Sequence, residues 1–320
     1  MSDKIPVTVL TGYFGAGKTT LLNRILSEPH GKKYAVIVNE FGEIGIDNDL
    51  IVGADEEVFE MNNGCVCCTV RGDLIRIIDG LLKRKGKFDG ILVETTGLAD
   101  PAPVAQTFFV DETVSGKTSL DAVVTVVDAK WLNDRLKDAP EAKNQIAFAD
   151  VIVLNKTDLV TPDELKDVEL RIRAINPFAK IHKTSRSAVA LDDVLSQGAF
   201  DLDRILAIEP HFLEGGHHHH DEDVQSFSFS ADAPLDAKTF FAWIDNVSQI
   251  QGPNILRAKG ILSFKDDPQR YVMQGVHMMF EGDHQRDWRE DEKRESRIVF
   301  IGRDLNQKAL QEGFEACIAK

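Results

Sequence analysis

The fold of this chain is decided by the stretch Gly12-Tyr13-Phe14-Gly15-Ala16-Gly17-Lys18-Thr19. An apolar, strand-like segment at Pro6–Leu10 precedes it, and a helical segment with an apolar face at Thr20–Leu26 follows it. Glycines at this spacing let the backbone turn so that N–H groups point inward at phosphate oxygens, and the start of a helix favours the same charge. The pattern predicts a P-loop between a strand and a helix. A glycine-rich turn with a chance lysine would not explain both flanking segments.

The residues of this loop have separate expected roles. Lys18 is expected to bridge the β- and γ-phosphates, and the Thr19 hydroxyl to bind Mg²⁺. Because both groups would contact the reacting phosphates, they are also candidate catalytic residues. The residues expected to hold the nucleotide are Gly12, Gly15, Ala16, Gly17, Lys18, Thr19 and Thr20.

A second group of candidates ends the apolar run Gly90–Glu94, which reads as another buried strand. The Glu94 carboxylate could hold Mg²⁺, often through water, and Gly97 could donate its N–H to the γ-phosphate. The alternative is a solvated strand end, which the presence of the P-loop makes less favourable. Glu94 and Gly97 are therefore candidate catalytic residues.

The sequence Asn155-Lys156-Thr157-Asp158 follows the apolar run Val151–Leu154 and indicates the base. Guanine presents an N1–H and an N2 amino group, and the Asp158 carboxylate can accept both hydrogen bonds. Adenine would face the same carboxylate with a ring acceptor and no amino group. Asn155 is expected to brace the loop and approach the O6/N7 side, and the Lys156 stem to lie over the ring. The motif favours GTP over ATP; the alternative is a solvated turn.

Three cysteines follow the turn-forming residues Asn62-Asn63-Gly64. Cys65, Cys67 and Cys68 are expected to lie in a loop, with helix beginning only after Thr69. Thiolates suit Zn²⁺ and other soft or borderline ions, and three protein ligands leave one tetrahedral position open for transfer. Buried inert cysteines, a strained disulfide between neighbours and a redox switch remain as alternatives.

Acidic and imidazole groups supply further candidates. Glu40 and Glu43 follow the second predicted strand, on the edge where a P-loop sheet binds its ligand. Either could sense Mg²⁺–GTP, align water or complete the metal shell, so Glu43 is a candidate catalytic residue and Glu40 a candidate metal ligand. The alternative is a solvated loop.

A histidine run stands beside three acids in a low-complexity stretch bounded by glycines. Its members are His217, His218, His219 and His220. Neutral imidazoles there could buffer metal, although a flexible acidic linker without function explains the run equally well.

The lone Cys317 has helical spacing with Phe314 and Leu310, which favours a core position.

Composition limits the class of protein. The chain has 320 residues, 28% of them charged, and a formal net charge of −15. Such an acidic surface repels phosphate backbones and anionic lipids. We therefore expect neither nucleic acid nor membrane as a partner. No apolar run approaches the ~20 residues of a membrane span, and no signal-peptide pattern begins the chain. We therefore expect a cytoplasmic protein, where a cysteine cluster favours metal or redox chemistry.

Periodicity predicts two domains joined by a linker. Continuous apolar runs alternating with helical segments predict a doubly wound α/β domain, a P-loop NTPase with a mainly parallel sheet, over residues 1–205. Its expected strands are Pro6–Leu10, Tyr34–Val38, Gly90–Glu94, Ala122–Val127, Val151–Leu154 and Ala179–Lys183, and its expected helices Lys18–Ser27, Arg71–Arg84 and Pro162–Ile175. A His-rich acidic linker is expected at 206–223.

Residues 224–320 are expected to form a smaller α+β domain with a mainly antiparallel sheet. Phe227 and Phe229 alternate with serines, as in a half-buried strand. A helix is expected at Pro234–Ile250, a last helix near the C-terminus, and strands near Leu256–Phe264, Tyr271–Phe280 and Arg297–Ile301.

Taken together, the P-loop, the CxCC trio, Glu94–Gly97 and Asn155–Asp158 resemble CobW-type GTPases. The likeness extends to the His-rich connection and to Tyr271–Val276 and Ser296–Gly302 in the C-terminal domain, so it covers nearly the whole chain. The resemblance implies a GTP-dependent metallochaperone of the same broad class as the urease and hydrogenase nickel-insertion GTPases.

In the zinc-transferring branch of that family, the CxCC cysteines carry Zn²⁺ and GTP hydrolysis accompanies delivery to a client metalloprotein. Other branches handle cobalt or serve metal-dependent hydratases, so Co²⁺ remains an alternative. Val38 stands where some relatives have an acid, and no metal ligand is expected from it. The expected cofactors are GTP, Mg²⁺ and Zn²⁺, and a GTP-dependent homodimer is a further expectation.

Two other functional classes remain open. A small-molecule phosphotransferase would need a second substrate pocket, and the guanine motif argues against it. A metal store or sensor would bind many ions through the histidine run, and the compact thiolate trio argues against it. The C-terminal domain is expected to recognise the client, with the charged segment Asp283–Arg297 as a candidate contact surface.

Overall fold

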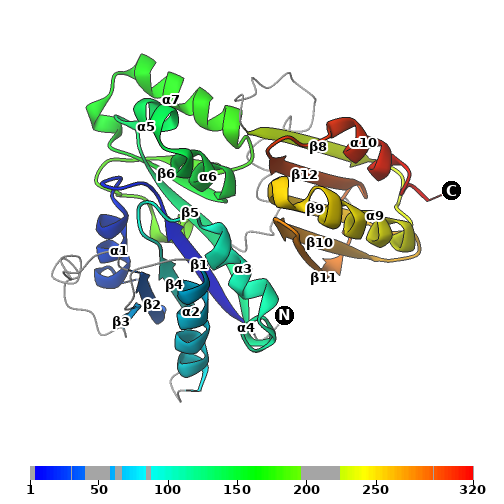
Figure 1. Ribbon diagram of the computed structural model, residues 1–320, viewed down its shortest axis with the longest axis horizontal. Coiled ribbons are helices and arrows are strands. Elements are labelled where there is room, and N and C mark those ends of the chain that lie inside the picture. The colour runs from blue at the N-terminus through cyan, green and yellow to red at the C-terminus, as the bar shows by residue number, and fades with distance from the viewer. Residues whose placement is uncertain are drawn as a thin grey trace. The chain divides into compact units, whose positions relative to one another are not determined.

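A computed structural model describes residues 4–29, 31–39, 58–61, 67–83, 88–195, 224–290 and 292–319. These divide into two compact units: the first holds the described residues up to 173 and residues 178–195, and the second holds residues 174–177 and the described residues from 224 onward (Figure 1). The expected linker at 206–223 lies outside the described residues, as do Glu40, Glu43, Cys65 and the histidine run.

The first unit is built on a seven-stranded sheet. Its strands are β1 (Ile5–Thr11), β2 (Tyr34–Asn39), β3 (Val58–Met61), β4 (Gly90–Glu94), β5 (Thr118–Asp128), β6 (Val151–Asn155) and β7 (Lys180–Lys183). They lie in the order β3-β2-β4-β1-β5-β6-β7, and every neighbouring pair is parallel. The predicted P-loop α/β fold is therefore confirmed. The continuous apolar runs of β4 and β6 are buried throughout, as strands covered on both faces require.

Helices cover both faces of this sheet (Figure 1). They are α1 (Lys18–Ser27), α2 (Cys67–Leu82), α3 (Ala102–Val110), α4 (Glu112–Lys117), α5 (Leu132–Asp138), α6 (Pro140–Phe148) and α7 (Pro162–Ile175), with 3-10 turns at η2 (Thr157–Leu159) and η3 (Leu191–Asp193). The expectation that helix begins after Thr69 is wrong, because α2 begins at Cys67. No glycine or proline interrupts Cys67–Val70, so the helix anchored by buried Leu74 and Ile78 extends back to the cysteines.

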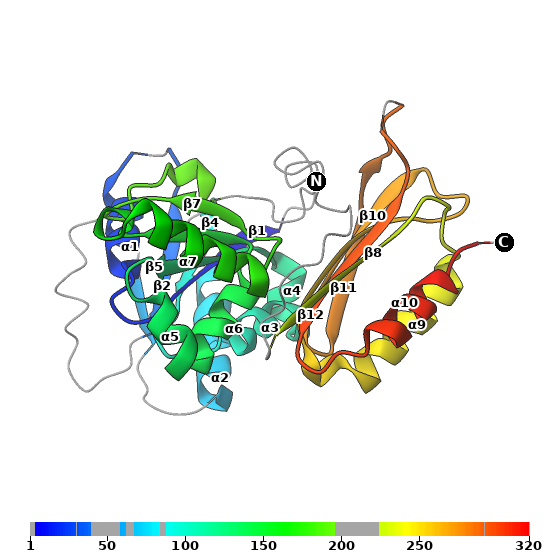
Figure 2. The ribbon, with the colours of Figure 1, turned by 90° about the horizontal axis from the view of Figure 1, so that it is seen from above.

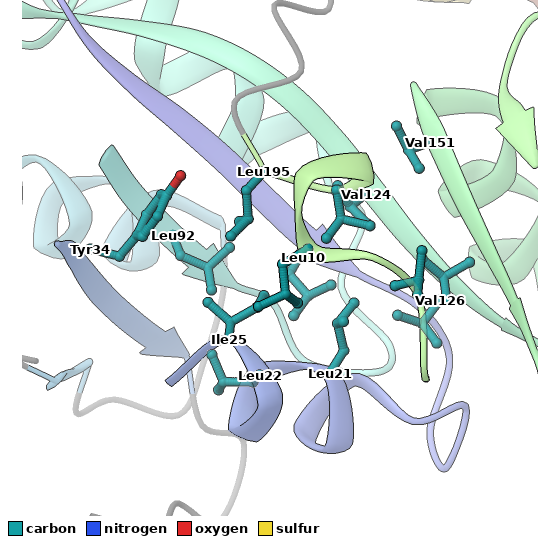
Figure 3. Packing of buried hydrophobic residues seen from close by; sticks show 14 of the residues in the cluster. Leu10, Leu21, Leu22, Ile25, Tyr34, Leu92, Val124, Val126, Val151 and Leu195 are labelled. Carbon is teal, nitrogen blue, oxygen red and sulfur yellow. The ribbon is translucent and has the colours of Figure 1, made fainter. Parts of the chain in front are cut away.

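The core lies directly beneath the P-loop. Leu21, Leu22 and Ile25 on the inner face of α1 pack against Leu10 and Val124 of the central strands (Figure 3). Each such side chain is at most 1% exposed, and burying one stabilises the fold by about 1.5–3 kcal/mol. The helix that leaves the P-loop is thereby held firmly on the sheet, which fixes the direction in which its first N–H groups point.

The second unit is a five-stranded antiparallel sheet in the order β11-β10-β9-β12-β8. Its elements are β8 (Gln225–Ala231), α9 (Ala237–Ile250), η4 (Gly252–Asn254), β9 (Ile255–Ser263), β10 (Gln269–Val276), β11 (Met279–Asp287), β12 (Ser296–Gly302) and α10 (Gln307–Glu315). Both helices pack on one face (Figure 2). The predicted α+β architecture with a mainly antiparallel sheet is confirmed.

Two details of this unit differ from expectation. The run Tyr271–Phe280 is two strands, because the chain turns at His277 in the left-handed region (φ 53°) without a glycine or proline to signal it. The last helix ends at Glu315, before Cys317. Cys317 is nevertheless a core residue, and burial raises the pKa of its thiol to about 11. No helix in the described ranges is long and apolar enough to cross a membrane.

Candidate functional site

The P-loop owes its shape to three glycines with positive φ angles. Gly12, Gly15 and Gly17 have φ angles of 141°, 70° and 115°, in the region that favours glycine. A Cβ on Gly12 would lie 2.2 Å from the carbonyl oxygen of Val126, and one on Gly17 would lie 2.4 Å from Nδ2 of Asn155. The loop is therefore closely packed against the ends of β5 and β6.

The Lys18 ammonium lies over the inside of this loop. Lys18 is the first residue of α1 and is buried, and its Nζ donates to the carbonyl oxygen of Gly12 at 2.8 Å. Thr19 is partly buried in the first turn, whereas Thr20 is exposed. Ammonium and helix N-terminus thus present positive charge at one place, which suits the terminal phosphates of a nucleotide.

Glu94 ends β4 next to the P-loop strand. It is buried, and it lies opposite Leu10 of β1 on one side and Val38 of β2 on the other. Thr95 ties the two strand ends together, because its N–H donates to Leu10 O at 2.9 Å and its Oγ1 to Thr11 Oγ1 at 2.9 Å. The structure therefore brings the Glu94 strand end to the strand from which the P-loop leaves.

The oxygen donors fit a magnesium ion. Mg²⁺ prefers oxygen ligands and is commonly held by one or two protein groups together with phosphates and water. Thr19 offers a hydroxyl and Glu94 a carboxylate from neighbouring elements. Among the residues described, no three His, Cys, Asp or Glu side chains gather into a metal-binding group.

Asn155 braces the P-loop from β6. Its buried side chain donates from Nδ2 to Ala16 O at 2.8 Å and accepts at Oδ1 from the Ser187 N–H at 2.8 Å. Ser187 in turn donates from Oγ to Gly17 O at 3.0 Å. These bonds join β6, the P-loop and the segment that contains Ser187, so Asn155 stabilises the shape of the site. A direct contact between Asn155 and guanine stays a prediction.

The segment Thr184–Ala188 is a part of the site that sequence reasoning missed. It follows β7 on the same sheet edge, and Thr184 O accepts from the Thr157 N–H at 3.1 Å. Arg186 and Ser187 both have left-handed φ angles, of 51° and 52°. The available signal was the polar run Thr184-Ser185-Arg186-Ser187 directly after the last parallel strand, since ligand-contacting loops lie at this edge of such sheets.

The guanine motif presents one acidic side chain to solvent. Asp158 is exposed in η2, where its carboxylate is accessible to a base. Lys156 has a φ of 60°, and its ammonium forms a 2.7 Å ion pair with the Asp128 carboxylate. Asp128, which lies opposite Asn155 in the sheet register, was not a sequence candidate. This ion pair fixes the Lys156 side chain beside the end of β5.

Two of the three cysteines of the motif begin a helix. Cys67 and Cys68 are the first two residues of α2, which follows β3. Because neighbouring strands lie about 4.8 Å apart, β3 lies roughly 10 Å from β4 and its Glu94. The N-terminus of a helix also favours the thiolate form of cysteine. The start of α2, with Cys67 and Cys68, therefore follows a strand that ends on the same sheet edge as the P-loop strand and Glu94.

Replacing Gly17 with alanine is expected to destabilise the first unit and weaken nucleotide binding. The left-handed φ and the collision with Asn155 and Ser187 together cost about 2–4 kcal/mol. Thermal unfolding and nucleotide titration measure the two effects. Gly116→Ala is the matched control, because an added Cβ there meets nothing within 4 Å. An unchanged melting temperature in the Gly17 variant would contradict the packing described.

Comparison with known proteins agrees with the fold and the motifs. The model of the CobW/HypB/UreG nucleotide-binding domain matches residues 6–183, and that of the cobalamin synthesis protein cobW C-terminal domain matches residues 224–318. The chain is 35% identical over 319 residues to the zinc chaperone YjiA of Escherichia coli, covering 98% of each protein.

A second relative and a solved structure extend this likeness. The zinc-regulated GTPase metalloprotein activator 1 of Schizosaccharomyces pombe is 35% identical over 316 residues, which cover 87% of this chain and 77% of the relative. The crystal structure of the Zn(II)-bound YjiA GTPase superposes with a TM-score of 0.76 at 30% identity, over 99% of each chain. Both halves of the sequence match the same family. The chain therefore belongs to the CobW family of P-loop GTPases.

Proposed function

We propose that this protein is a GTP-dependent zinc chaperone, which binds Zn²⁺ through Cys65, Cys67 and Cys68 and transfers it to a client metalloprotein. The observation that carries the proposal is the strand order β3-β2-β4-β1. It sets the start of α2, with two of the three cysteines, on the same edge as the P-loop and Glu94. The names of the relatives, zinc chaperone and GTPase, support the same conclusion.

In nucleotide binding, each sequence motif has its own role. Asp158 accepts the two N–H groups of guanine, and Lys156 covers the ring while paired with Asp128. Lys18 exchanges its bond to Gly12 O for the β- and γ-phosphate oxygens. Mg²⁺, held by Thr19 and Glu94, would offset the charge of the phosphates.

Hydrolysis is assigned to groups that surround the terminal phosphate. Gly97 donates its N–H to the γ-phosphate, and Glu43 aligns the attacking water in line with the bond that breaks. Glu43, like Glu40, lies outside the described residues, so its share in this step rests on sequence alone. Loss of the γ-phosphate removes the contact to Gly97 and thereby distinguishes GTP from GDP.

The proposed metal-binding role follows from the chemistry of the cysteine ligands. Three thiolates bind Zn²⁺ strongly and leave the fourth tetrahedral position for water or for a ligand of the client. Co²⁺ accepts the same ligands, so the cobalt chaperone remains the second candidate within the family. The histidine run could hold additional ions, and the client and a GTP-dependent homodimer also remain predictions. Recognition of the client is assigned to the second unit.

Replacing Cys67 with serine is expected to lower zinc affinity by about tenfold or more, because a neutral hydroxyl replaces a thiolate ligand. Titration in a zinc buffer with a competing chelator measures the dissociation constant and separates this ion from loosely bound zinc. Co²⁺ titrated in the same way ranks the two metals.

Cys317→Ala is the matched control for this experiment, because Cys317 is buried in the core of the second unit. Its zinc affinity should equal that of the wild type. If the Cys67 variant binds zinc as tightly as the wild type, the ion is held elsewhere and the proposed site is wrong.

A further inference from the structure

One buried polar side chain in the first unit joins the segment after Glu94 to α6. Gln145 lies in α6 and is 1% exposed. Its Nε2 donates two hydrogen bonds, to Gly97 O at 3.1 Å and to Ala99 O at 3.1 Å. Both amide hydrogens of the side chain are thus directed at one short stretch of backbone, 46 to 48 residues away in sequence.

That stretch is a tight turn. The Ala99 N–H donates to Thr96 O at 3.1 Å, which closes a turn over Thr96–Ala99. Gly97 O and Ala99 O are left to find partners outside the turn, and Gln145 supplies both. The preceding residue of α6, Asn144, donates to the carboxylate of Asp100 at 3.3 Å, so α6 also holds the residue after the turn.

The turn is already seated on the P-loop. A Cβ added to Gly97 would lie 2.6 Å from ring carbons of Phe14 and 2.7 Å from the Phe14 backbone nitrogen. The turn is therefore in contact with the loop on one side and hydrogen-bonded to Gln145 on the other. It has no room to move closer to the P-loop, but it could move away if the Gln145 bonds were lost.

Gln145 is itself fixed in place. Its backbone carbonyl accepts from Thr125 Oγ1 of β5 at 2.8 Å, which anchors this turn of α6 on the sheet. A buried amide that makes two donor bonds is costly to replace, because the two carbonyls would lose their partners in a low-dielectric environment. The Thr96–Ala99 turn is therefore held on one side by Gln145, which is anchored on β5, and on the other side by the P-loop.

We propose that Gln145 is a positioning residue that holds the Thr96–Ala99 turn against the P-loop and so sets the preference of the site for GTP over GDP. The inference rests on the proposed role of Gly97 as donor to the γ-phosphate. With the turn held in place, this donor is preorganised, and binding the γ-phosphate requires no ordering of the segment. GDP has no γ-phosphate to contact the turn, so its affinity does not depend on Gln145.

The test compares Gln145→Met, which keeps the size of the side chain and removes its donors, with the wild type. We expect the dissociation constant of a non-hydrolysable GTP analogue to rise about tenfold and kcat for GTP to fall, with the GDP dissociation constant changed less than about twofold. Gln145→Glu, which keeps the shape but only accepts when ionised, should behave in the same way. Glu141→Gln, one turn earlier in α6, is the matched control and should leave all three quantities unchanged.

Equal losses of affinity for the GTP analogue and for GDP would overturn the inference, because Gln145 would then only support the fold. Tighter binding of the analogue would also overturn it, since the turn would be held in an inactive position. So would a failure of both variants to fold. If the wild type itself neither binds the analogue nor hydrolyses GTP, the proposed function fails. A GTPase whose Gln145 variants match the wild type refutes this inference alone.

Discussion

Replacing Asp158 with asparagine is expected to change the base preference of the nucleotide site from guanine to xanthine. The carboxylate accepts from N1–H and from the N2 amino group of guanine, whereas an asparagine side chain offers one acceptor and one donor. Its donor would face the amino group of guanine but would match the carbonyl that xanthine carries at that position. Discrimination by paired and unpaired polar groups is large, so we expect GDP affinity to fall about 100-fold.

Titration with GDP and with xanthosine diphosphate measures this change directly. Because Asp158 is exposed in η2 and supports no other element, the variant should keep the melting temperature of the wild type. Asp163→Asn, at the exposed start of α7, removes a nearby negative charge and is the matched control. If the Asp158 variant still prefers GDP over xanthosine diphosphate, another group reads the base.

Much of the first unit could be predicted because its strands are continuous apolar runs. β4 was expected at Gly90–Glu94, α1 at Lys18–Ser27 and α7 at Pro162–Ile175, and all three lie there. β3 was missed because it has four residues and one of them is a glutamate. α4 and α5 are too short for a helical period to emerge, and α3 is apolar on all sides, so it shows no amphipathic face.

In the candidate site, residues of local sequence motifs could be predicted, whereas residues that act on distant parts of the chain could not. The P-loop, Glu94, the CxCC segment and Asp158 belong to motifs in which neighbours in sequence act together. Ser187 and Gln145 could not be predicted, because they act through hydrogen bonds to residues 170 and 48 positions away. Asp128 is a similar case, since only the pairing of β5 with β6 brings it to Lys156. Such residues carry no motif of their own.

The second large effect expected is a rise in zinc affinity when GTP binds. The coupling between the γ-phosphate and the cysteines would act along one sheet edge. The Thr96–Ala99 turn follows β4, whose Glu94 lies opposite Val38 of β2, and β2 in turn pairs with β3. A γ-phosphate contact at the turn would favour the metal-binding arrangement of the cysteines. We expect about a 100-fold difference, or roughly 2.7 kcal/mol of coupling.

Thermodynamic linkage supplies an internal check on this coupling. If GTP strengthens zinc binding by a given factor, zinc must strengthen binding of the GTP analogue by the same factor. Lys18→Ala, which removes the phosphate contact while leaving the cysteines in place, should abolish the effect of nucleotide on zinc. Its zinc affinity should equal that of the nucleotide-free wild type.

The most direct measurement is the zinc dissociation constant of the wild type, determined against a competing chelator without nucleotide, with GDP and with a non-hydrolysable GTP analogue. We predict the tightest binding with the analogue, and weaker binding by about 100-fold with GDP and without nucleotide. Equal dissociation constants in all three states would contradict the account, because the cysteine site would then be insensitive to the γ-phosphate.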